Sequence, residues 1–181
     1  MTSALFCQLA RYNQWMNRKL YDAASVISDE QLHADKGAFF GSVFGTLNHL
    51  AVADTLWLKR FALHPAGFSS LVQMADHPQP TALDQPLRSS FAELLTLRAT
   101  LDDIIIAFTL ELRDEHLASA LEYKSTKGVP SRKLLGDVLM HFFNHQTHHR
   151  GQATTLFSQM GMDVGATDLL LLMPNLPDPQ P

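Results

Sequence analysis

The sequence predicts an all-α protein, a four-helix bundle with a long crossover loop. Apolar residues recur every three or four positions in four long segments, which is the spacing of amphipathic helices. Residues 64–86, between the second and third of these segments, are rich in proline and predict a long loop. No internal repeat or linker divides the 181 residues, so we expect a single domain over residues 1–181, with a tail at residues 162–181 that is partly irregular.

The first two helices are defined by their apolar faces and their caps. The first is expected over residues 3–26. Its apolar face is Leu5, Leu9, Tyr12, Met16, Leu20 and Ala23. Ser28 is followed three residues later by Gln31, a spacing typical of the capping box that begins a short helical turn. The second long helix is expected over residues 42–63, with Ser42 as its N-cap.

The third and fourth helices flank a segment that breaks helicity. The third is expected over residues 87–112, with Pro86 in its first turn, where proline is favoured. Residues 122–130 end in a Gly-Val-Pro sequence, which predicts an extended strip or a hairpin. The fourth helix is expected over residues 133–160, with Gly161 as its C-terminal cap.

The fourth helix carries four of the nine histidines. Because helical residues advance by about 100° each, His145 and His149 fall on the core-facing stripe, one turn apart. His141 lies at the edge of this stripe and His148 turns toward solvent, so we expect both to be peripheral. Two imidazoles at positions i and i+4 of a helix are a recurring zinc-type arrangement.

A third ligand is expected from another helix, because a catalytic metal usually takes three protein ligands and keeps one position open. His49 is the best candidate. It shares a stripe of the second helix with Gly45, Ala53 and Leu56. The small residues one turn on either side of His49 would let its backbone approach the partner helix.

Two motifs about a hundred residues apart carry a family resemblance: GTLNHL at residues 45–50 and NHQTHHRGQ at residues 144–152. With them, nearly the whole chain resembles the DinB (damage-inducible) family of metal-binding four-helix bundles. The resemblance implies a three-histidine metal site, with one histidine from the second helix and two from an HxxxH motif on the fourth. These positions are His49, His145 and His149, the residues that the stripe argument selects.

The resemblance also implies a function. The DinB-like superfamily includes thiol transferases, in which the metal activates a low-molecular-weight thiol, and apparent hydrolases. We therefore expect a divalent-metal-binding protein with metal-dependent thiol S-transferase or hydrolase activity on a small molecule. A non-catalytic metal-binding or stress-response protein is the alternative, because no strong general base is evident in the motif. Zinc or nickel is favoured, and iron, manganese and copper stay open.

Several polar residues near the motifs have two interpretations each. Gln152 can bind a metal-bound water or cap the polar pocket, and Asn48 can orient a ligand or cap a helix end. Arg150 points about 120° away from the centre of the stripe, which predicts a salt-bridge or interface residue. Asp54 and Tyr123 are notable for their positions, which alone assign them no role.

Other chemistries are set aside by composition and motif. The net charge of -4 gives no electrostatic footprint for nucleic acid, so we expect no such partner. Gln146 stands where the HExxH zincins have their general base, a glutamate, so peptidase chemistry of that type is not expected. The predicted inner faces lack the glutamates of di-iron bundles. The chain has no CxxCH, Walker A or GxGxxG motif.

The single cysteine, Cys7, excludes an internal disulfide and fits a reducing compartment, so we expect a cytoplasmic protein. The sequence shows no signal-peptide pattern and no apolar run near the length that spans a bilayer, and we expect no membrane partner. A homodimer is expected, because the resemblance implies one and the apolar run 169–173 needs cover. That run can equally pack on its own bundle.

Overall fold

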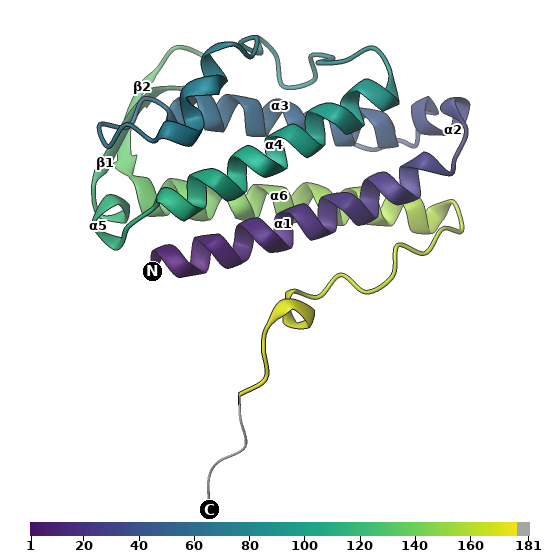
Figure 1. The fold of residues 1–181 in the computed structure, drawn as a ribbon. Coiled ribbons are helices and arrows are strands. Elements are labelled where there is room, and N and C mark those ends of the chain that lie inside the picture. The colour runs from purple at the N-terminus through teal and green to yellow at the C-terminus, as the bar shows by residue number, and fades with distance from the viewer. Residues whose placement is uncertain (177–181) are drawn as a thin grey trace, which may run out of the picture.

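The structure is a computed structural model that describes residues 1–176. The end of the predicted irregular tail, residues 177–181, lies outside the described residues. The elements, labelled in Figure 1, are α1 (Ser3–Ser25), α2 (Asp29–His33), α3 (Val43–Phe61), a 3-10 helix (Ser69–Ala75), α4 (Phe91–Glu111), α5 (Asp114–Leu117), β1 (Ala120–Lys124), β2 (Pro130–Leu134), α6 (Leu135–Gln159) and a second 3-10 helix (Leu169–Leu172).

The four long helices form the predicted bundle. In Figure 1, α1, α3, α4 and α6 run alongside one another, and α1 and α3 each pack on both α4 and α6. Aromatic rings join three of the helices: Phe61 of α3 stacks on Phe108 of α4 at 5.3 Å between centroids and meets Phe142 of α6 edge to face at 5.7 Å. The all-α prediction is confirmed, with one small hairpin added to it.

The first residues of α3 and α4 are set by serine N-caps, and not by the proline at position 86. The Ser42 side chain accepts a hydrogen bond from the Gly45 N–H at 3.0 Å, as expected of an N-cap. The prediction that α4 begins near Pro86 is wrong, because Ser90 and Glu93 form a capping box that places its first residue at Phe91. The predicted capping box before α2 is present.

The buried face of α1 is turned relative to the prediction. The residues that it buries are Phe6, Ala10, Asn13, Met16, Asn17, Leu20, Tyr21 and Ala24. Only Met16 and Leu20 belong to the predicted face. The physical reason is that Asn13 and Asn17 point into the core, where they meet polar partners, whereas periodicity arguments assign asparagine to the solvent side.

The crossover segment between α3 and α4 is anchored rather than free. Lys59 of α3 donates a hydrogen bond to the carbonyl of Met74 at 2.6 Å, and the Ser69 hydroxyl donates to the Glu111 carboxylate of α4 at 2.8 Å. The edge-to-face contact of Phe68 on Phe108 adds apolar packing. The segment therefore lies over the bundle, as Figure 1 shows, and reaches the N-terminal end of α4 along α3.

The antiparallel pair of β1 and β2 confirms the hairpin alternative for residues 122–130 and extends it to residues 120–134. Gly161, with φ +76°, ends α6 as expected.

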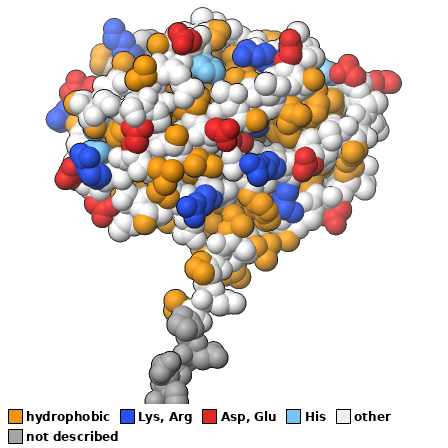
Figure 2. All heavy atoms as spheres, viewed as in Figure 1, with side chains coloured by type: hydrophobic (Ala, Val, Ile, Leu, Met, Phe, Trp, Pro, Cys, Tyr) orange, Lys and Arg blue, Asp and Glu red, His pale blue; other side chains and the backbone are white. Residues whose placement is uncertain are grey.

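Beyond α6, Tyr12 donates a hydrogen bond to the carbonyl of Thr167 at 2.6 Å, which ties that part of the tail to α1. The run 169–173 then leaves the bundle (Figures 1 and 2), and the Leu170 side chain is 72% exposed. On the face in Figure 2, acidic and basic side chains are interspersed. None of the described helices combines the length and apolar character needed to cross a membrane.

Candidate metal centre

Three histidines converge between α3 and α6. The Nε2 atom of His49 lies 3.4 Å from Nε2 of His145 and 3.2 Å from Nε2 of His149. Within residues 1–176, these three form the only group of histidine, cysteine or acidic side chains close enough to hold a metal ion together. The structure thus brings together all three residues selected from the sequence, although they are up to 100 positions apart.

The spacing of the nitrogens suits a tetrahedral ion. Two nitrogens that each lie about 2.0–2.1 Å from zinc and subtend the tetrahedral angle are separated by about 3.3–3.4 Å. The separations of 3.2 and 3.4 Å from Nε2 of His49 to the other two match this value, and the ligand atoms of all three residues lie within 4.8 Å of one another. The donor set is therefore compatible with a single ion.

Hydrogen bonds on the far sides of two rings fix which nitrogens face the centre. Nδ1 of His49 lies 2.8 Å from the carbonyl oxygen of Leu83, and Nδ1 of His149 lies 2.7 Å from Oε1 of Gln152. Both partners are acceptors, so in the neutral rings the protons sit on Nδ1 and the Nε2 lone pairs point at one another. Lone pairs cannot bond to each other, and an ion between them removes the conflict.

Burial favours the neutral form of the ligands. Desolvation lowers the pKa of His49 to about 4, partly opposed by its hydrogen bond to Leu83. It lowers the pKa of His145 to about 3, with further lowering from His149 and His49, and it also lowers the pKa of His149. Imidazole binds a metal only when it is deprotonated, so the site is prepared for coordination at neutral pH.

Phe40 forms an apolar wall on one side of the cluster. Its ring stacks on His49 with 3.8 Å between centroids and meets His149 edge to face at 5.5 Å. Its backbone is also close to α3, because a Cβ added at Gly45 would lie 2.1 Å from the Phe40 carbonyl oxygen. Gly45 therefore admits the segment before α3, and the prediction that it admits a partner helix is corrected.

We expect Gly45→Ala to destabilise the fold by about 1–2 kcal/mol, because the new methyl group overpacks a contact with rigid backbone. The free energy of unfolding from denaturant titration measures the effect. Gly151→Ala in α6 is the matched control, since a Cβ there meets nothing within 4 Å and should stabilise the helix slightly. Equal effects of the two substitutions would contradict the role assigned to Gly45.

The neighbouring polar residues hold the site in place. Asn48 donates to the carbonyl of Gln85 and accepts from the N–H of Leu87, both at 2.9 Å, so it anchors the crossover segment and caps no helix. Gln152 binds His149 itself. His141 and His148 are exposed and lie outside the cluster, in agreement with their predicted peripheral places.

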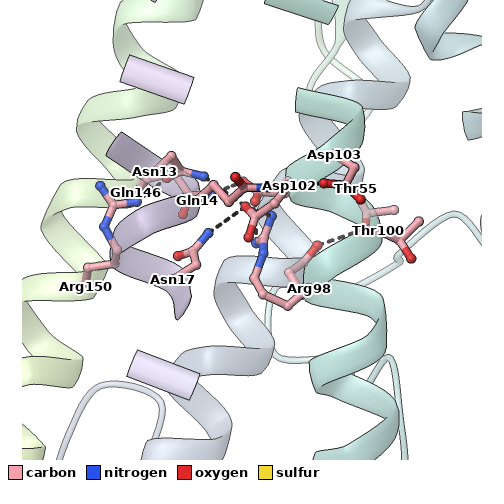
Figure 3. A network of polar contacts seen from close by, with 12 residues as sticks. Asn13, Gln14, Asn17, Thr55, Arg98, Thr100, Asp102, Asp103, Gln146 and Arg150 are labelled. Atoms are coloured by element: carbon pink, nitrogen blue, oxygen red, sulfur yellow. Dashed lines mark hydrogen bonds and ion pairs between the residues drawn. The ribbon is translucent and has the colours of Figure 1, made fainter. Parts of the chain in front are cut away.

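A buried polar network crosses the bundle core beside the site (Figure 3), and sequence reasoning missed it. Arg98 of α4 lies 2.6 Å from the carboxylate of Asp54 and 3.0 Å from that of Asp102, and all three side chains are at most 3% exposed. Asn17 of α1 donates to Asp102 at 2.8 Å, and Gln146 of α6 donates to Asp54. The network thus joins all four long helices.

The network could have been noticed from paired polar spacings. Asn13 and Asn17, like Arg98 and Asp102, are separated by four positions within predicted helices, and each pair lies on one helix face. Burial is the main cause that raises the pKa of Asp54 to about 6, the negative charge of Asp102 adds to the rise, and Arg98 opposes it.

The prediction that Arg150 is a salt-bridge or interface residue is wrong. Its side chain is 3% exposed, and it donates hydrogen bonds to Asn13 of α1 and to Thr147. The physical reason is that α6 packs on both α1 and α3, so it has two buried faces rather than one stripe. The second face carries Gln146 and Arg150, each one residue beyond a histidine of the cluster.

A serine–histidine pair at the far end of α3 offers no nucleophile. Nε2 of His64 lies 2.8 Å from the Ser119 hydroxyl, but Nδ1 of His64 accepts a hydrogen bond from the N–H of Ala66. In the neutral ring the proton is therefore on Nε2 and is donated to Ser119, which in turn donates to the carbonyl of His116 at 2.6 Å. This imidazole cannot take the serine proton.

Comparisons with known proteins agree with this architecture. The chain is 24% identical over 161 residues to the protein named Protein DinB of Bacillus subtilis (strain 168), covering 89% of each chain. No solved structure matches it. The sequence model of the DinB family matches residues 1–177, and the chain therefore belongs to the DinB family.

Proposed function

We propose that the chain binds one divalent metal ion through the Nε2 atoms of His49, His145 and His149. We further propose that the chain is an enzyme whose activity depends on this ion. The observation that carries the proposal is the convergence of three imidazoles, two of them held with their Nδ1 protons directed outward. Zinc or nickel suits this neutral nitrogen set best, and iron, manganese and copper are the other candidates.

Such an ion, when bound, supplies Lewis acidity that lowers the pKa of a water or thiol at its open position. The residues of the chain would bind the ion and orient its ligands. Leu83 and Gln152 hold the rings of His49 and His149 by hydrogen bonds, and Phe40 shields one side of the cluster from water. The chain's own thiol is engaged elsewhere, since Cys7 donates to the carbonyl of Thr109 at 3.1 Å. The proposed activity is therefore transfer of an external small thiol, or hydrolysis.

A non-catalytic metal-binding protein is the second candidate. One observation favours it: no aspartate or glutamate belongs to the histidine cluster in the described part of the chain. A general base must lie within hydrogen-bond reach of the proton that it takes. If the chain is an enzyme, a bound thiol or water would have to lose its proton without a carboxylate in the cluster that accepts it as a general base.

Metal analysis of paired variants tests the ligands. We expect His149→Ala to lower the metal content of the purified protein strongly, because it removes one of three ligands. His148→Ala is the matched control on the next position of α6, and it should leave the metal content nearly unchanged, because His148 lies outside the cluster. Equal losses in the two variants would refute the proposed ligand set.

Turnover assays then separate the two candidate functions. The metal-loaded protein is given a panel of electrophiles with low-molecular-weight thiols, and separately a panel of esters and amides. Activity that disappears in His149→Ala and persists in His148→Ala supports the enzyme. Full metal content without turnover in either panel supports the non-catalytic protein.

We also propose that the chain forms a homodimer in which the run 169–173 is covered. Leu170 and Leu171 are 72% and 58% exposed, and no residue of the 3-10 helix Leu169–Leu172 is buried. Light scattering is expected to give twice the chain mass, and a chain ending at residue 168 to give the monomer. A monomeric full-length chain, or a dimer that survives the truncation, would contradict this.

A further inference from the structure

A cavity of about 1300 Å³ lies between the C-terminal half of α3, the crossover segment and the β1–β2 hairpin. Its apolar walls include Leu56 of α3 and Leu63, Val72 and Met74 of the crossover segment. Small-molecule sites typically have volumes of about 300–1,000 Å³, so the space can hold a sizeable ligand. The three histidines are not among its lining residues, and the cavity is therefore distinct from the candidate metal centre.

Arg60 is held at the wall of this cavity by two aromatic rings. Its guanidinium carbon lies 4.5 Å from the ring centroid of Trp57 and 5.3 Å from that of Tyr123, which comes from the hairpin. The two rings are themselves in edge-to-face contact at 5.3 Å. A guanidinium close to aromatic rings is attracted to them without using its N–H groups as hydrogen-bond donors to an oxygen, so these donors stay free for a ligand.

Within residues 1–176, Arg60 has neither a carboxylate partner nor a hydrogen-bond acceptor for its side chain. The other arginine in the lining, Arg132, pairs with Glu122 at 3.1 Å. Glu122 is the only acidic residue in the lining, against the four basic residues Lys59, Arg60, Lys124 and Arg132. Arg60 is partly buried, so its five donors are partly withdrawn from water without an acceptor from the chain.

We propose that this cavity binds an organic anion whose carboxylate pairs with Arg60 and whose apolar body lies against Leu63 and Val72. The planar fork of a guanidinium matches a carboxylate with two parallel hydrogen bonds. The excess of positive charge in the lining attracts such a group, and the apolar walls favour an organic body over a fully hydrated ion.

The anion site needs no metal. His49 and Arg60 are eleven residues apart on α3, which is about 16 Å along the helix axis at 1.5 Å per residue. None of the three histidines lines the cavity, so a carboxylate bound to Arg60 is not placed as a ligand of the histidine cluster. Anion binding at Arg60 would therefore be independent of metal binding at the histidines, and each can be tested without the other.

Binding of 4-phenylbutyrate to the full chain tests the proposal. The chain has two tryptophans, so Trp15→Phe leaves Trp57, which contacts Arg60, as the only fluorescent indole. We expect saturable change of Trp57 emission, weaker affinity by about tenfold or more after Arg60→Gln, and similarly weak binding of the neutral 4-phenylbutyramide. Arg60→Lys should keep part of the affinity, because it keeps the charge and loses the fork.

Arg113→Gln is the matched control, since Arg113 is an exposed arginine outside the cavity, and it should bind as the parent does. Each variant is melted by circular dichroism, and the measurement is repeated after chelation and in inorganic phosphate. Absence of saturation in the parent at millimolar ligand, unchanged affinity in Arg60→Gln, or equal affinity for the amide would overturn the proposal. So would binding that is lost on chelation, or phosphate that competes as well as a carboxylate.

Discussion

Replacing Arg98 by methionine is expected to lower the free energy of unfolding by about 3–5 kcal/mol, because it leaves two buried carboxylates without their cation. Asp54 is fully buried and Asp102 is 3% exposed, so water cannot take over the role of the guanidinium. The remaining donors, the amides of Asn13, Asn17 and Gln146, reduce the cost without neutralising the charge. Urea titration followed by circular dichroism measures the change.

The matched control for Arg98→Met is Arg113→Met, because Arg113 forms an ion pair with Glu115 in which both side chains are at least 67% exposed. Exposed pairs contribute about 0–1 kcal/mol, so this variant should be nearly neutral. A loss of less than about 1 kcal/mol in Arg98→Met would show that the core relaxes or admits water around the two carboxylates.

Removal of the metal is expected to lower the melting temperature by about 5–10 °C while the helices persist at room temperature. The proposed ligands lie on α3 and α6, and an ion that binds only the native state stabilises it by about 2.7 kcal/mol at a hundredfold excess over Kd. A chain of this size loses about 2–4 °C per kcal/mol. Thermal melts of metal-loaded and chelated protein, followed by circular dichroism, measure the shift.

The helices should survive chelation because the aromatic core of Phe61, Phe108 and Phe142 is independent of the histidines. This distinguishes the protein from a zinc finger, whose fold requires its ion. Helix lost at room temperature on chelation would mean that the metal is structural. An unchanged melt after confirmed metal removal would mean that the ion does not couple α3 to α6. As a control, chelation of the His149→Ala variant should not change its melting temperature.

The place of the histidine cluster followed from the sequence because it depends on helical phase alone. His145 and His149 are one turn apart, and His49 lies on the buried face of another helix, so packing the faces together brings their rings into contact. The outward hydrogen bonds could not be predicted. Leu83 and Gln85 belong to the crossover segment, which is not helical, so no residue periodicity predicts that they contact α3.

The errors in the fold have a common physical cause. Periodicity assigns polar residues to the solvent side, and in this bundle Asn13, Asn17 and Arg150 are buried because they satisfy one another and the charged residues of α4. The start of α4 differs from the prediction because the Ser90–Glu93 capping box, and not Pro86, begins the helix. The residue pattern of one helix does not show which polar side chains of other helices will lie against it.

The polar network also bears on how far the helices can slide past one another. Apolar faces of leucine and phenylalanine tolerate a shift of one helical turn, about 5.4 Å, because one ridge of side chains resembles the next. A shift of α4 by one turn would move Arg98 away from Asp54 and leave both charges unpaired in the core. The network therefore sets the register of the bundle, and through Gln146 it aligns α6 with α3 so that their imidazoles meet at the same level.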